Sequence, residues 1–72
     1  MARLPILSGR AIVKALATAG YVETRQRGSH IRLVCAGKTS ITVPNHKVVG
    51  RGLLKKILRD AELSGEQFVK LL

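Results

Sequence analysis

The chain has 72 residues, enough for one domain, and 46% of them are hydrophobic, a composition that excludes wholesale disorder. No apolar run approaches the roughly 18 residues that a membrane-spanning helix needs. The net charge of +9 favours a polyanionic partner, with a basic surface that serves only solubility as the alternative.

The positive charge is concentrated in the first 59 residues. Twelve of the 13 Lys and Arg residues lie there with Glu23 as the single acid, and the other three acids lie in residues 60–72. A membrane surface is a weaker candidate partner than a nucleic acid, because no segment combines a basic face with a long apolar stripe and aromatic residues.

Two features favour a cytoplasmic protein. Residues 1–7 are too short and too interrupted by polar residues and proline to form a secretory signal. Cys35 is the single cysteine, and its place in a strand pattern indicates packing as a small apolar group.

The first predicted element is a helix over about residues 9–19. Ser8 is suited to the N-cap, and Gly20 is suited to the left-handed position beyond the C-cap. Residues at helical spacing predict the buried stripe: Ile12, Val13, Leu16, Ala17 and Ala19. Arg10 and Lys14 are four residues apart, so we expect them to share a face turned away from that stripe.

Three short strands are predicted next, over residues 21–27, 30–36 and 39–43. Tight turns join them and Pro44 ends the third, which indicates an antiparallel meander. Alternation in the first strand assigns one face to Tyr21, Glu23, Arg25 and Arg27 and the other to Val22, Thr24 and Gln26. Alternation in the second strand sets Ile31, Leu33 and Cys35 opposite His30, Arg32 and Val34.

A basic loop over residues 45–51 leads into a second helix, predicted over about residues 51–61. Its buried stripe is predicted to contain Leu53, Leu54, Ile57, Leu58 and Ala61. Residues 64–67 have the pattern of a capping box, so a short terminal helix should follow and bury Phe68, Leu71 and Leu72. The sequence thus predicts one α+β domain over residues 1–72, in the order α-β-β-β-α with a three-stranded antiparallel sheet and a short C-terminal helix.

The candidate chemistry lies in the segment between the first two strands. Arg25 and Arg27 alternate and should point to one face, Gly28 and Ser29 form the turn, and His30 opens the next strand. A histidine side chain can exchange protons near neutral pH, and guanidinium groups suit an anionic substrate. No Cys, His, Asp and Glu spacing typical of a metal site is present, so we expect neither a metal nor another cofactor.

Several of these segments together resemble the HicA mRNA interferase toxin family. The resemblance rests on Ser8-Gly9 before a helix, Ala19-Gly20-Tyr21, and Arg25-Gln26-Arg27-Gly28-Ser29-His30. It continues through Val43-Pro44-Asn45-His46, Gly52-Leu53-Leu54-Lys55-Lys56-Ile57-Leu58, and the Leu63-Ser64, Glu66 and Phe68 pattern near the C-terminus. These segments extend over nearly the whole chain.

The resemblance implies a fold like that of the double-stranded-RNA-binding domain. It also implies a metal-independent endoribonuclease that cleaves mRNA and is inhibited by a HicB antitoxin. Under it, the catalytic histidine of the family corresponds to His30 and the preceding glycine to Gly28. RNA contacts are expected from a wider set of residues: Arg25, Arg27, Gly28, Ser29, His46 and Lys47.

Two functions of other classes remain open from the residues alone. A non-catalytic double-stranded-RNA-binding module would read A-form shape through phosphates and 2′-hydroxyls with the same charge and fold. A protein-interaction domain could dock its basic face on an acidic partner. Against both, passive binding does not require a histidine in an arginine-flanked turn.

Overall fold

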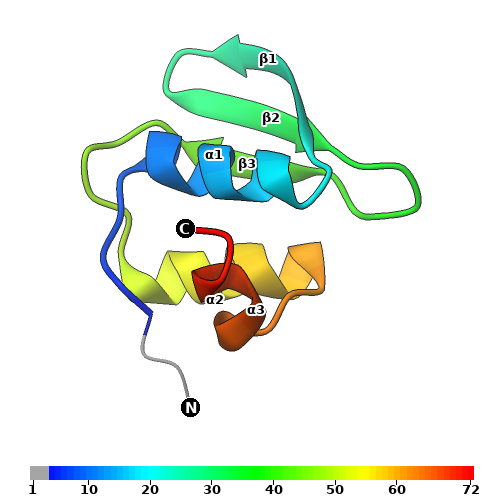
Figure 1. Cartoon of the computed structure of the whole chain (residues 1–72). Coiled ribbons are helices and arrows are strands. Elements are labelled where there is room, and N and C mark those ends of the chain that lie inside the picture. The colour runs from blue at the N-terminus through cyan, green and yellow to red at the C-terminus, as the bar shows by residue number, and fades with distance from the viewer. Residues whose placement is uncertain (1–3) are drawn as a thin grey trace.

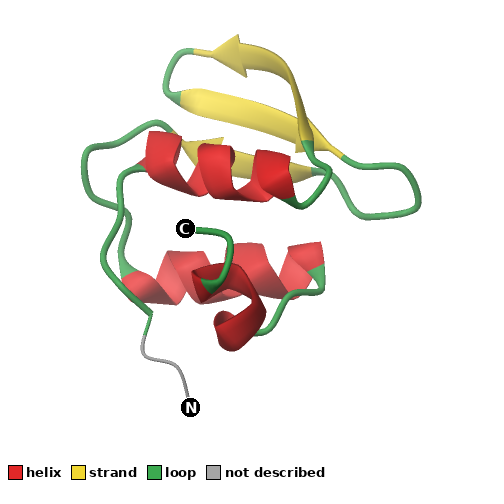
Figure 2. Cartoon of the chain, viewed as in Figure 1, coloured by secondary structure: helices red, strands yellow, loops and turns green. Residues whose placement is uncertain are grey.

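The computed structural model describes residues 4–72, and its helices and strands follow the predicted order (Figures 1 and 2). The elements are α1 (Gly9–Thr18), β1 (Val22–Arg27), β2 (His30–Val34), β3 (Ile41–Pro44), α2 (Arg51–Ala61) and α3 (Gly65–Val69). The α+β class is therefore confirmed. Residues 1–3, part of the segment judged too short for a secretory signal, lie outside the described residues. None of the helices in the described part of the chain is long and apolar enough to cross a membrane.

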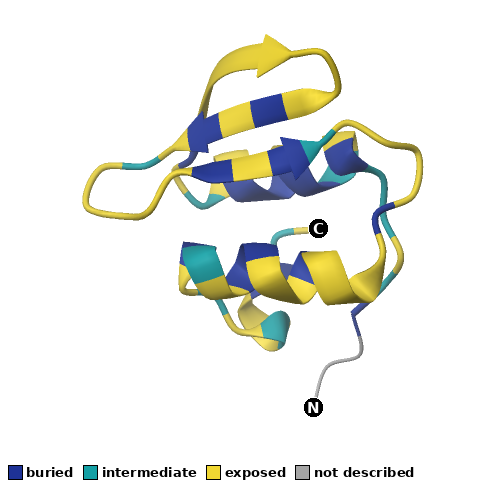
Figure 3. Cartoon of the chain, turned by 180° about the vertical axis from the view of Figure 1, so that it is seen from behind, coloured by how far each residue is buried: buried dark blue, intermediate teal, exposed yellow. Residues whose placement is uncertain are grey.

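The three strands form one antiparallel sheet in the order β1-β2-β3. Helices α1 and α2 lie on the same face of this sheet, and α3 packs against α2 (Figure 1). The view from behind shows the outer face of the sheet, where exposed residues alternate with buried ones along β2 and β3 (Figure 3). The sheet thus has one face in the core and one face in solvent.

The core lies between the sheet and the helices. The sheet contributes Ile31, Leu33, Ile41 and Val43; the helices contribute Ile12, Val13, Ala15, Leu16, Leu54, Ile57, Leu58, Ala61 and Phe68. The prediction for the first helix was wrong at Ala17, which is exposed, whereas Ala15 is buried. The stripe is centred between Ile12 and Leu16, and Ala15 lies angularly closer to that centre than Ala17. Leu53 and Leu72, at 41% and 55% exposure, were also wrongly placed in the core.

The start of α1 is fixed against the end of β3. Ser8 caps the helix, its Oγ accepting a hydrogen bond from Ala11 N at 3.1 Å. A Cβ at Gly9 would lie 1.9 Å from the carbonyl oxygen of Pro44, so only glycine permits this approach of helix to strand. Gly9 N also donates to the carbonyl of His46 at 2.9 Å. The loop after β3 is thereby held against α1.

Other local predictions are confirmed with small shifts. Ser64 and Gln67 form the capping box that begins α3. The third strand begins at Ile41 rather than at residue 39, because the connection after β2 is longer than the predicted turn. Within that connection, Lys38 Nζ donates to the carbonyl of Ala61 at 3.1 Å, which joins the loop to the last turn of α2.

Candidate functional site

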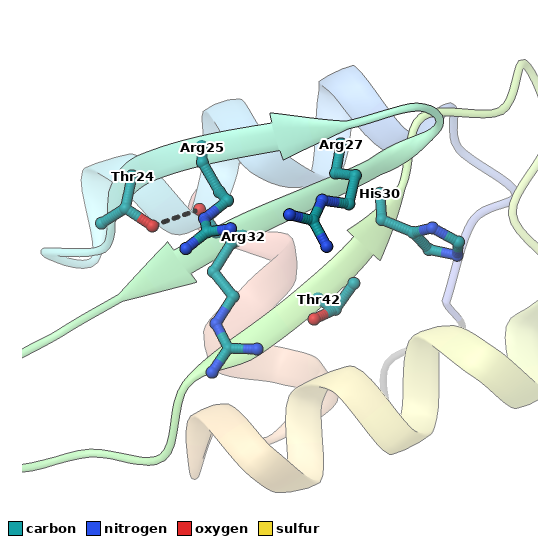
Figure 4. Close-up of a pocket in the computed structure, with 6 residues that line it drawn as sticks. All are labelled: Thr24, Arg25, Arg27, His30, Arg32 and Thr42. Atoms are coloured by element: carbon teal, nitrogen blue, oxygen red, sulfur yellow. Dashed lines mark hydrogen bonds between the residues drawn. The ribbon is translucent and has the colours of Figure 1, made fainter.

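An open groove of about 620 Å³ lies on the outer face of the sheet, which the helices do not cover. Its lining residues are all exposed: Thr24, Arg25, Arg27, His30, Arg32 and Thr42. Figure 4 shows their side chains rising from all three strands. The groove therefore combines three guanidinium groups, one imidazole and two hydroxyls on a surface open to solvent.

His30 is the first residue of β2 and lies at one end of the groove (Figure 4). In the sheet it pairs with Arg27 of β1 on one side and with Pro44 of β3 on the other. Of the two turn residues before it, Gly28 and Ser29, only Gly28 has a positive φ, +59°. That is the pattern of a type II′ hairpin turn, which matches the twist of the flanking strands. The turn chemistry therefore fixes where β2 begins and which face His30 occupies.

Both residues of this turn accept a hydrogen bond. The side-chain amide of Gln26 donates to the carbonyl of Gly28 at 3.1 Å. The backbone N–H of Asn45, just after β3, donates to the carbonyl of Ser29. The turn is thus linked to its own strand and to the end of β3, which restricts its position beside the groove.

The first strand contains a β-bulge that changes the predicted faces. Arg32 and Leu33 are consecutive on β2. Their partners on β1 are Arg25 and Glu23, so Thr24 is an extra residue between those two. Glu23 lies opposite Leu33 on the face covered by the helices. The prediction that Glu23 shares a face with Arg25 is therefore wrong, because the extra residue reverses the alternation at this point.

The bulge brings Glu23 onto the same face of the sheet as Gln26, and both side chains contact α1. Arg10 Nη1 forms an ion pair with Glu23 Oε1 at 2.9 Å, and Arg10 Nη2 donates to Gln26 Oε1 at 2.8 Å. The Arg10 side chain is therefore engaged with β1 and does not simply point into solvent with Lys14. Tyr21, assigned to the arginine face by strict alternation, precedes the strand and is buried in the core.

The groove has no acidic lining residue. Within residues 4–72 the one ion pair is that of Arg10 with Glu23, so the three groove arginines have no described acidic partner. Their charges are available to an anion from solvent. Guanidinium groups bind phosphate oxygens through paired N–H donors, so an arginine-rich groove suits a phosphodiester.

Sequence reasoning did not include Arg32 among the binding candidates. Arg32 pairs with Arg25 on one side and with Thr42 on the other, so it lies in the middle of the groove. The sequence did contain a signal for Arg32, because alternation along the second predicted strand places it on the same face as His30. Which residues of β1 and β3 flank it depends on strand register.

The structure brings some predicted site residues together and leaves others apart. Arg25, Arg27 and His30 line one groove. His46 and Lys47 lie exposed in the loop between β3 and α2 and are not groove-lining residues. Within residues 4–72, no three His, Cys, Asp or Glu side chains gather into a group that could hold a metal ion.

Comparison with known proteins gives one result that covers the groove. The family model described as the HicA toxin of bacterial toxin–antitoxin systems matches residues 9–63. This range includes the groove residues and extends from the start of α1 past the end of α2. The search of the curated proteins found no match to the chain.

Proposed function

Because the chain belongs to the HicA toxin family of bacterial toxin–antitoxin systems, we propose that it is an endoribonuclease that cleaves mRNA in the groove on the outer face of its sheet. The observation that carries this proposal is the composition of the groove. An imidazole lies there with three guanidinium groups and no carboxylate. Such a site attracts a polyanion and contains a side chain capable of proton transfer.

The proposed reaction is cleavage of RNA by its own 2′-hydroxyl. This reaction needs a base that takes the 2′ proton, an acid that protonates the leaving 5′-oxygen, and cations around the phosphorus. We assign one of the two proton transfers to His30. Solvent water serves as the partner in the other transfer. The charge that develops on the phosphate is stabilised by Arg25, Arg27 and Arg32, a role for which no metal ion is then required.

RNA beyond the cleaved phosphate is proposed to contact the residues around the groove. The turn residues Gly28 and Ser29 immediately precede His30, and their backbone can approach a sugar–phosphate chain closely. Lys47 extends the cationic surface along the loop after β3, and His46 beside it offers a hydrogen-bonding side chain. These contacts are to the backbone of RNA, and they position it rather than select a sequence.

A toxin of a toxin–antitoxin system acts with an antitoxin. We propose that the antitoxin is a HicB-like protein that covers the His30 face in the cytoplasm and excludes mRNA from the groove. The support is the charge of the molecule, because a net charge of +9 favours an acidic partner surface.

The proposal is tested by substituting His30 with alanine. We expect cleavage of a labelled RNA to fall by about 10²–10⁴-fold, the usual contribution of one general acid–base group. Thermal unfolding and affinity for a non-cleavable RNA should stay close to wild type, because the His30 side chain is exposed and makes no hydrogen bond to a described residue. The substrate should also resist cleavage when the 2′-hydroxyl at the cut is removed, and a chelator should leave the rate unchanged.

The matched comparison is His46→Ala, which removes the other histidine. We expect this variant to weaken RNA binding and to leave the turnover at saturating RNA intact, since His46 lies outside the groove. Wild-type turnover by a folded His30→Ala variant would contradict the assignment. Tight binding of duplex RNA with no cleavage by the wild type would favour the non-catalytic double-stranded-RNA-binding module.

A further inference from the structure

The β-bulge in β1 has a consequence for the sign of the charge in the groove. Toward the turn, the ladder pairs Arg27 with His30 and Arg25 with Arg32. If the strand continued without a bulge, the next two pairs would be Thr24 with Leu33 and Glu23 with Val34. Residues opposite Val34 lie on the outer face, so Glu23 would share the face of the groove arginines.

The observed strand places the acid on the other face. Glu23 pairs with Leu33, which is 1% exposed and points into the core. From there its carboxylate reaches Arg10 of α1 at 2.9 Å. Glu23 is also the single acid among residues 4–59, and with Glu23 on the other face the groove has no acidic side chain.

The extra residue occupies the outer face instead. Thr24 lines the groove, and its Oγ1 donates to the backbone carbonyl of Arg32 at 3.4 Å (Figure 4). Opposite Val34, where regular alternation would put Glu23, lies the apolar Val22, and the neutral Thr24 occupies the bulge beside Arg25. Bulges commonly redirect side chains beside functional sites, and here the redirected side chain is charged.

We infer that the bulge at Thr24 sorts charge between the two faces of the sheet, and that residue 24 is a position that sets the affinity of the groove for RNA. This inference rests on the proposed function, because it names a determinant of the same site. Thr24 keeps this part of the groove free of negative charge and does not take part in the chemistry.

The decisive experiment transposes two neighbouring residues. The variant Glu23→Thr/Thr24→Glu has the composition and net charge of the wild type, but it moves the acid into the groove. We expect roughly tenfold weaker binding of a 2′-O-methylated RNA, because a carboxylate now competes for the arginines. Regular alternation predicts the opposite result, since the transposition would then take the acid out of the groove and tighten binding.

Two variants with uncharged residues at both positions 23 and 24 separate the effect of the carboxylate from the effect of side-chain size. Glu23→Thr/Thr24→Gln has the bulk of the transposed variant without its carboxylate, and it should restore affinity to within about twofold of wild type. The single variant Glu23→Gln removes the acid at its native position, and it should change affinity by less than about twofold. Charge at position 24 should thus matter much more than the same charge at position 23.

A double-mutant cycle tests the geometry without RNA. If Glu23 faces α1, the losses of thermal stability caused by Arg10→Ala and Glu23→Gln will not add in the double variant. Additive losses, or transposed protein that binds as tightly as wild type, would overturn the inference. Heparin serves as a second polyanion. If the wild type binds no RNA but the variants show the expected order of affinities for heparin, the proposed function is wrong and the inference about the bulge is supported.

Discussion

Tyr21 is a buried residue whose hydroxyl lacks a partner. The residue is 3% exposed, and within residues 4–72 its hydroxyl has no hydrogen bond. Burial raises the pKa of the Tyr21 hydroxyl above 10, with smaller contributions from Cys35, Glu62 and Asp60. The folded state therefore favours the neutral phenol and disfavours the phenolate.

This environment predicts how Tyr21→Phe changes stability. The hydroxyl is desolvated without compensation, so we expect its removal to raise the free energy of unfolding by about 1 kcal/mol at pH 7. Because the pKa is raised on folding, the stability linked to the neutral phenol is complete below about pH 10 and is lost at higher pH. Urea unfolding at pH 7 and pH 11 should show a larger loss for wild type than for Tyr21→Phe. Lower stability of the variant at both pH values would contradict this account.

Gly9 in the first turn of α1 and Gly52 in the first turn of α2 have different surroundings. A Cβ at Gly9 would collide with the carbonyl of Pro44 at 1.9 Å, whereas a Cβ at Gly52 would meet nothing within 4 Å. We expect Gly9→Ala to lower the free energy of unfolding by about 1–3 kcal/mol or more, as overpacking does. Gly52→Ala should raise it by about 0.5–1 kcal/mol, because alanine restricts the unfolded chain and favours helix.

Chemical denaturation of the two variants separates the effects. Both substitutions add one methyl group in the first turn of a helix, so they differ mainly in the space available. Since Pro44 is also the ladder partner of His30, we expect Gly9→Ala to reduce RNA cleavage as well. Equal stability of the two variants would mean that α1 and β3 can separate without cost.

The elements that the sequence predicted well are those with local signals. Ser8 and the capping box at Ser64 mark the starts of α1 and α3, and the Gly28 turn sets the β1–β2 hairpin. The helix over residues 51–61 was predicted with its observed bounds.

The bulge could not be predicted in the same way. Alternation is a local rule, but an extra residue in one strand is defined only by its partner strand. The contact of Arg10 with Glu23 depends on the packing of α1 against β1, two elements whose relation the sequence does not reveal. Arg25, Arg27 and His30 were nevertheless assigned to a common site and do line one groove; their roles in cleavage stay predictions.

At the scale of the whole molecule, charge separates along the chain and across the fold. The groove arginines have no described acidic partner, while Asp60, Glu62 and Glu66 lie at the C-terminal end of α2 and in the segment that follows. We expect this asymmetry to orient an acidic antitoxin toward the groove. Its association rate should fall steeply as ionic strength rises, because charge steering is screened by salt.

Co-expression with a HicB-like protein, size-exclusion chromatography and cleavage assays test this arrangement. The complex should bury roughly 1,200–2,000 Å² and lose RNA cleavage. In the bound state, His30 and the groove arginines should be protected from solvent in hydroxyl-radical footprinting, and Lys14 on α1 should stay reactive as the control. A stable complex that cuts RNA as fast as the free chain would rule out occlusion of the groove.

The position of the groove on the uncovered face of the sheet has a consequence for how toxicity can be lost. Its side chains are exposed and lie outside the core, so we expect that replacing one of them can abolish the proposed activity without unfolding the protein. When bacteria that express the toxin without its antitoxin survive through spontaneous mutations in the toxin gene, we expect mutations of two kinds, in core residues or in groove residues. Core alleles should disappear by proteolysis, whereas groove alleles should accumulate as folded, harmless proteins that still occupy the antitoxin. By sequestering antitoxin, such an allele would sensitise a cell that also carries an intact copy of the toxin.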